Sequence, residues 1–147
     1  MITSLIALLA LQGDNVPPVV SLKLVTPHVT ANKAFTANLV VKFADGLHGY
    51  QNPPSDQFEI PVTVKLKSGE AKLIKIGYPK GADMTMPGDT KPTKVYSGSI
   101  TIPLSFKAGK HLGPVVVTLN YQQCTGANCF PPSAVDAKAD LSAPHKG

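Results

Sequence analysis

Two cysteines are the residues whose type and spacing carry the clearest chemistry. Cys124 and Cys129 lie in the segment 121–132, which reads Tyr-Gln-Gln-Cys-Thr-Gly-Ala-Asn-Cys-Phe-Pro-Pro. Four residues separate them, and Gly126 and Asn128 can adopt the positive φ that many tight turns use. Such a turn brings two Cα atoms within disulfide range, about 4.4–6.8 Å. The spacing therefore allows a local disulfide.

A bridge across so short a loop would stabilise the fold only weakly. The loop-entropy model gives it ~2 kcal/mol before any strain is subtracted. Disulfides that hold a sandwich together join distant strands across the core. Local bridges are more easily reduced, so the spacing favours a redox role. The alternative is a non-catalytic binding or adhesion sandwich whose disulfide is structural.

Metal sites and hydrolytic sites have less support. A structural zinc site needs four ligands, whereas the cysteine pair supplies two. Met84 and Met86 place two thioethers in one segment, which suits Cu(I), so a periplasmic copper-binding protein is a further alternative. Both methionines could equally cover apolar surface. No G-x-S-x-G motif and no glycine-rich phosphate loop occurs, and we expect neither a cofactor nor a metal. The histidines show no paired spacing: they are His28, His48, His111 and His145.

The amino-acid composition argues against nucleic acid as a binding partner of this protein. The 147 residues include 14 Lys and Arg against 9 Asp and Glu, a net charge of +5 with neutral histidines. All the basic residues are Lys, whereas readers of guanine and phosphate usually employ Arg. We therefore expect no nucleic-acid partner. No apolar run reaches the ~18 residues of a membrane span.

The elements that position the cysteines are predicted to be β-strands. Apolar and polar residues alternate along the chain, and Gly, Pro, Asn and Asp mark the turns between the runs. This pattern predicts an all-β, antiparallel β-sandwich. The segments 46–58 and 80–93 are expected to be long functional loops. The expected strands lie within 20–24, 35–43, 62–67, 72–78, 100–107, 115–121 and 137–141.

The cysteine segment resembles that of a known family. The pattern Tyr-Gln-x-Cys-x4-Cys-Phe-Pro-Pro is similar to the active-site strand and turn of the N-terminal periplasmic domain of the thiol:disulfide interchange protein DsbD. Supporting segments occur in the family's order at 45–50, 78–81 and 95–103. The resemblance extends from about Val19 to Leu141. It implies an immunoglobulin-like sandwich with a redox-active cysteine pair.

The resemblance also implies roles and partners. By position, Cys129 matches the cysteine that forms mixed disulfides, and Cys124 matches the one that resolves them. A thioredoxin-like donor reduces the pair. The dithiol then reduces disulfide isomerases or thioredoxin-like proteins that serve cytochrome c maturation. The chain is thus expected to be part of a protein-disulfide reductase system, with a membrane protein as a further candidate partner.

Relatives shield their cysteines with a cap loop that often carries an aromatic residue. The corresponding segment, 83–89, has none, so Met84 or Met86 is expected to act as the lid. Asp83 and Asp89 are candidates for the acidic residues of this loop.

Other candidate residues flank the pair. His48 and Tyr50 match positions beside the active site in relatives, and His48 is a candidate to tune the thiol pKa. The plainer alternatives are a solvated loop position for His48 and simple packing for Tyr50. The remaining residues of the active-site surroundings are Tyr121, Phe130 and Pro131. Of these, Phe130 and Pro131, together with Pro132, are expected to shape the turn and offer an apolar docking surface.

The N-terminal segment is predicted to lie outside the domain. Met1–Gln12 is apolar and resembles the core of an export signal, so cleavage near Gly13 and a periplasmic location are expected. Residues 14–147 then form one domain. No C-x-x-C motif follows, so the electron donor is expected to be another chain.

Overall fold

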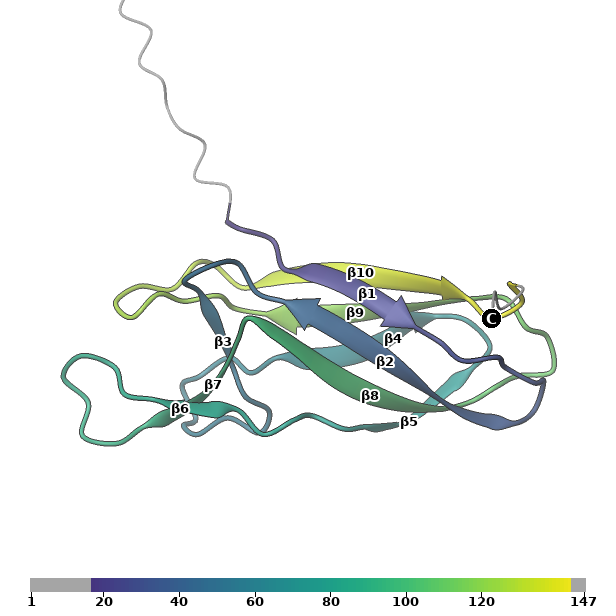
Figure 1. Ribbon diagram of the computed structural model, residues 1–147, viewed down its shortest axis with the longest axis horizontal. Coiled ribbons are helices and arrows are strands. Elements are labelled where there is room, and N and C mark those ends of the chain that lie inside the picture. The colour runs from purple at the N-terminus through teal and green to yellow at the C-terminus, as the bar shows by residue number, and fades with distance from the viewer. Residues whose placement is uncertain (1–16, 144–147) are drawn as a thin grey trace, which may run out of the picture.

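The computed structural model describes residues 17–143 (Figure 1). The predicted export signal within 1–13 and the tail 144–147 lie outside the described residues. No helix long and apolar enough to cross a membrane occurs in the described part. The described strands are β1 (Ser21–Val25), β2 (Ala34–Lys42), β3 (His48–Tyr50), β4 (Thr63–Ser68), β5 (Lys72–Ile76), β6 (Ala82–Met84), β7 (Thr93–Ser97), β8 (Ser99–Lys107), β9 (Pro114–Tyr121) and β10 (Ser133–Asp140).

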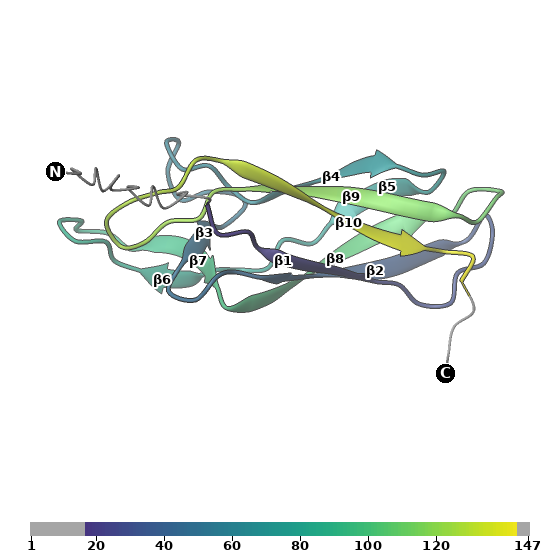
Figure 2. The ribbon, with the colours of Figure 1, turned by 90° about the horizontal axis from the view of Figure 1, so that it is seen from above.

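Two antiparallel sheets form the sandwich. One has the order β1-β2-β8-β5 and the other the order β10-β9-β4. Figures 1 and 2 show them as two layers along the long axis of the molecule. Alternate residues of each strand face the other layer, as period-two alternation requires. The predicted all-β, immunoglobulin-like antiparallel sandwich is thus confirmed. Residues from both layers that are almost completely buried include Leu39, Val41, Ile102, Leu104, Val64, Val117 and Leu119.

A third, smaller sheet has the order β3-β7-β6. Strands β3 and β6 fall within the segments 46–58 and 80–93, which the sequence predicted to be loops, and β7 was not predicted at all. That prediction is wrong for a simple reason. Strands β3 and β6 have only three residues each, too few to display an alternation that could be distinguished from a loop. In β7 the adjacent residues Val95 and Tyr96 are both buried, so its five residues do not alternate.

The small sheet and the β9–β10 connection meet at one end of the sandwich (Figures 1 and 2). Tyr121 at the end of β9 pairs with Ser133 at the start of β10. The intervening connection carries both cysteines. Its Cys124 pairs in turn with His48 of β3, which ties the connection to the small sheet.

Candidate functional site

Cys124 and Cys129 form a disulfide across a tight turn. Their Cα atoms are 4.0 Å apart, and the two residues lie opposite each other in an antiparallel bridge. The backbone hydrogen bonds fall on either side of this pair, from Thr125 N–H to Asn128 O (2.7 Å) and from Phe130 N–H to Gln123 O (2.9 Å). The cysteines thus occupy a non-hydrogen-bonded position, where paired residues approach most closely.

The turn does not use the positive φ that its sequence suggested. Neither Gly126 nor Asn128 adopts one. Instead, the Thr125 hydroxyl accepts hydrogen bonds from the N–H groups of Ala127 (3.2 Å) and Asn128 (3.0 Å). A side-chain oxygen that binds nearby backbone N–H groups can hold a turn in this way. These hydrogen bonds do not involve sulfur, so the turn has support besides the disulfide.

The two cysteines differ in access to solvent. Cys124 is 1 % exposed, whereas Cys129 lies at the surface of the turn. A sulfur on another protein can therefore contact Cys129 Sγ directly. Cys124 Sγ is accessible only to groups within the domain, such as Cys129.

His48 lies directly opposite the buried cysteine. Its N–H donates to the Cys124 carbonyl (3.0 Å), and the Cys124 N–H donates to the His48 carbonyl (2.9 Å). Residues directly opposite each other in an antiparallel pair project to the same face. His48 is only 2 % exposed, which corrects the solvated-loop alternative. Burial lowers the pKa of His48 from its usual 6.5, so the imidazole is neutral at neutral pH.

Tyr50 contacts the exposed cysteine. Its hydroxyl oxygen is 3.9 Å from Cys129 Sγ, and its ring meets the His48 ring edge-on at 5.7 Å. Burial raises the pKa of Tyr50, and the carboxylates of Glu59 and Asp89 raise it further. The phenol therefore keeps its proton at neutral pH and can donate it to sulfur.

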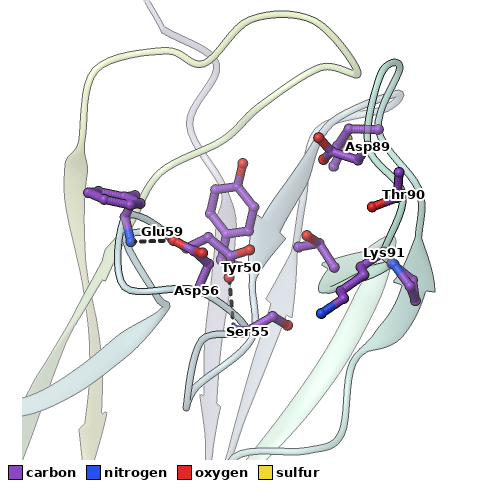
Figure 3. Close-up of a pocket in the computed structure, with 11 residues that line it drawn as sticks. Tyr50, Ser55, Asp56, Glu59, Asp89, Thr90 and Lys91 are labelled. Carbon is purple, nitrogen blue, oxygen red and sulfur yellow. Dashed lines mark hydrogen bonds between the residues drawn. The ribbon is translucent and has the colours of Figure 1, made fainter.

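A groove of about 510 Å³ begins beside Tyr50. The 55–59 turn forms one side and the segment 86–93 the other, with Tyr50 between them (Figure 3). Phe58, on the first side, is 84 % exposed. The charged side chains that line the groove are Asp56, Glu59, Asp89 and Lys91.

The residues expected to form a cap are distributed over two hollows. Met84, at the end of β6, lines a cavity of about 300 Å³ together with His48. Met86 lines the groove beside Tyr50. Asp83 pairs with Lys94 at 2.5 Å, while Asp89 faces the groove. Each methionine thus lies near one aromatic ring of the site, and a lid role for either stays a prediction.

The residues that flank the cysteines support the turn. Tyr121 is a core residue whose hydroxyl accepts a hydrogen bond from Val20 N–H (3.3 Å). Phe130 is half-buried, and Pro131 and Pro132 are exposed next to the disulfide. Docking on Phe130, Pro131 and Pro132 stays a prediction.

Three residues of the site were not singled out by the sequence. Gln123 is 1 % exposed; its Oε1 accepts from Ala44 N–H (2.9 Å) and its Nε2 donates to Pro18 O (2.5 Å). Phe58 and Glu59 reach the groove because the chain folds back there. A buried glutamine next to a cysteine has no distinctive sequence signal, and neither does an apolar residue in a polar loop.

Comparisons with known proteins agree on one family. The family model described as "Thiol:disulfide interchange protein DsbD, N-terminal" matches residues 18–141. No curated protein sequence shows a significant match. The N-terminal periplasmic domain of ScsB from Proteus mirabilis superposes with a TM-score of 0.60 at 14 % identity, over 85 % of this chain and 46 % of that one. The chain thus spans less than half of that structure.

Two structures from Neisseria meningitidis are also similar. The reduced DsbD N-terminal domain gives a TM-score of 0.52 at 19 % identity, covering 80 % of this chain and 81 % of that one. A complex of the DsbD and PilB N-terminal domains gives 0.49 at 23 % identity, covering 89 % and 90 %. At these identities, the superpositions with TM-scores of 0.60 and 0.52 support the fold.

Proposed function

The chain belongs to the family of the N-terminal domain of the thiol:disulfide interchange protein DsbD, and on this basis we propose that it relays electrons in the periplasm by thiol–disulfide exchange at Cys124 and Cys129. The observation that carries the proposal is the unequal exposure of one disulfide. Cys129 is open to a partner, while Cys124 is buried behind it. This arrangement suits an exchange that starts at one sulfur and ends at the other.

As a reductant, the domain begins with two thiols. The Cys129 thiolate attacks one sulfur of a partner disulfide, so that a mixed disulfide forms and the partner's other sulfur leaves as a thiolate. The Cys124 thiolate then attacks Cys129 Sγ, forms the internal disulfide and releases the partner's second thiolate. Two electrons pass to the partner, and its thiolates take up two protons.

Regeneration follows the same path in reverse. A donor dithiol attacks the exposed Cys129 sulfur, and Cys124 leaves as a thiolate that takes up a proton. The donor's second thiol then attacks its own sulfur in the mixed disulfide, which frees Cys129. The domain gains two electrons, and the donor becomes a disulfide. Donor and acceptor are both thioredoxin-like in this proposal, as the family resemblance implies.

The groove beside Tyr50 supports a docking site for these partners. It starts at the phenol that contacts Cys129 and presents the exposed ring of Phe58. Its charged lining comprises three carboxylates and one ammonium group, although the whole chain has a net charge of +5. We propose that a thioredoxin-like partner places an apolar segment with a basic rim here.

A trapping experiment tests the proposed function. The oxidised domain is mixed with a reduced thioredoxin-like protein whose resolving cysteine is replaced by serine. We expect a mixed disulfide on Cys129, located by mass spectrometry of peptides, and none when Cys129→Ser is used. A mixed disulfide on Cys124 would reverse the two roles. No adduct, together with a bridge that resists mild reductant, would favour the binding sandwich with a structural disulfide.

The copper alternative has its own test. Met84 lies beside His48 and Met86 beside Tyr50, so the two thioethers line different hollows. Titration of the reduced chain with Cu(I) against a competing chelator decides the question. Binding weaker than that of the chelator removes this alternative.

A further inference from the structure

We propose that His48 is the proton acceptor for the Cys124 thiol when Cys124 resolves a mixed disulfide, and the proton donor to the Cys124 thiolate when the bridge is reduced. This inference deepens the proposed function and rests on it. It gives a chemical role to the buried imidazole of His48, whose Nε2 has no hydrogen-bond partner in the part of the chain that the structure describes.

The geometry of the bridge places the imidazole beside the buried cysteine. His48 and Cys124 form a hydrogen-bonded antiparallel pair, and Cys124 and Cys129 form the next pair across. Directly opposite residues share a face, with Cβ atoms about 4.5–5.5 Å apart. The Cβ atoms of His48, Cys124 and Cys129 therefore project from the same face of three neighbouring segments.

The imidazole itself has unused hydrogen-bonding capacity. His48 Nε2 is buried and has no hydrogen-bond partner among the described residues. A buried polar atom without a partner destabilises the fold, so such atoms call for an explanation. A thiol produced at Cys124 by reduction would supply the missing partner.

Burial, not neighbouring charge, favours a neutral imidazole in the oxidised protein. Burial is the cause that lowers its pKa. The ionisable groups around it are Tyr50 on its own strand, the cysteine pair, and Asp45 from the preceding turn, which lines the same cavity. Opposite His48, β7 presents the uncharged Ser97. Reduction introduces a thiolate next to the imidazole, and this charge stabilises the imidazolium.

The proton balance of the resolving step is then complete within the domain. The Cys124 S–H bond breaks and its proton moves to the imidazole. The sulfur's electron pair forms the bond to Cys129 Sγ, and the bond from Cys129 to the partner breaks, which releases the partner's thiolate. The imidazolium returns its proton to water. Reduction by a donor runs through the same steps in the opposite order.

One equivalent of dithiobis-nitrobenzoate, whose thiolate is coloured, separates the two steps without a protein partner. Attack by Cys129 releases the first thiolate, and attack by Cys124 on Cys129 Sγ releases the second. We expect His48→Gln to slow the second release about a hundredfold at neutral pH, the low end of the range for a positioned base. Its pH profile should move to higher pH, while the first release changes less than twofold.

His28→Gln is the matched control, since His28 is exposed. It should leave both releases and both pH profiles unchanged. An unchanged second release in His48→Gln, with an unchanged pH profile, would overturn the proposal. Because this assay uses a small disulfide, the proposal on His48 can fail while the partner-trapping experiment succeeds, and the reverse also holds.

A measurement on the unmodified chain covers the case in which His48→Gln does not fold. The His48 ring signals are titrated by NMR in the oxidised and in the reduced protein. We expect the pKa of His48 to differ between the two states, because only the reduced protein places an ionisable thiol beside the imidazole. The same pKa in both states would contradict a proton-transfer role.

Discussion

Gly49 lies against the ring of Phe43, and a Cβ built on it would be 2.7 Å from Cε1 of that ring. Gly49 sits between His48 and Tyr50 on β3, and alternate residues of a strand face opposite ways. The strand can therefore turn two functional side chains toward the disulfide because the residue between them has no side chain to clash with the core. This close approach fixes the distance of β3 from the sandwich.

Gly49→Ala should destabilise the oxidised protein by about 1–3 kcal/mol, the usual cost of overpacking a core. The methyl group would meet Phe43 and Val62, which are both buried. Urea unfolding measures the effect. Gly126→Ala is the control, because its Cβ would meet nothing within 4 Å and its φ is not positive. Equal stability of the two variants would contradict the close packing of β3.

Tyr50→Phe should make the reduced domain less reactive at Cys129. The substitution removes a hydroxyl that lies 3.9 Å from Cys129 Sγ and can donate a hydrogen bond to a thiolate. We expect alkylation of Cys129 by iodoacetamide at neutral pH to slow by roughly twofold to tenfold, which matches the ~0.5–1.5 kcal/mol of a typical hydrogen bond. Tyr78→Phe is the control, since that hydroxyl accepts from Val64 N–H. Equal slowing in both variants would argue against a specific contact.

The oxidised protein should lose stability on mild acidification because of His48. Burial lowers the folded-state pKa below the 6.5 of the unfolded chain. As the pH falls past 6.5, the unfolded state binds a proton that the folded state does not, so the free energy of unfolding decreases. The loss levels off below the folded-state pKa.

Urea unfolding at about pH 7.5 and pH 5.5 measures this loss, and the linkage relation sets its sign. His48→Gln should lose less stability than the wild type over this interval, and His28→Gln should behave like the wild type. Carboxyl groups whose pKa is lowered, such as Glu70 and Asp136, titrate at more acidic pH and are common to all three proteins. A wild-type loss fully retained in His48→Gln would assign it to another group.

Phe58→Ser should weaken docking without changing the chemistry at sulfur. An exposed aromatic ring at the centre of an interface can contribute about 2 kcal/mol or more to binding. We therefore expect kcat/KM for exchange with a thioredoxin-like partner to fall at least about tenfold, while reaction with dithiobis-nitrobenzoate stays the same. Ile74→Ser on β5 is the control, because Ile74 is 66 % exposed outside the groove. Equal effects of both variants would place docking elsewhere.

The sequence was sufficient to predict the main layers and the position of the cysteines. Strands that cross the sandwich bury every second residue over five to nine residues, and this alternation is visible without a structure. The start of β10 was predicted too late, at residue 137 instead of Ser133. Its small Ala residues give little contrast with their polar neighbours.

The environment of the disulfide could be predicted only in part. Sequence spacing identified the cysteines, but the burial of His48 depends on its pairing with Cys124, 76 positions further along the chain. The groove beside Tyr50 likewise depends on residues that are distant in the sequence, since its two sides come from the 55–59 turn and the segment 86–93. Turn propensity was misleading at Gly126, because the Thr125 hydroxyl supplies the hydrogen bonds that support the turn. Long-range pairing and local side-chain chemistry decide such features.

The hydrogen bonds of the Thr125 hydroxyl do not involve sulfur, so we expect them to keep the turn between Cys124 and Cys129 closed after reduction. Reduction therefore leaves the two thiols at a high effective concentration toward each other, and ring closure competes strongly with any second partner. We therefore expect electrons to leave the domain in pairs.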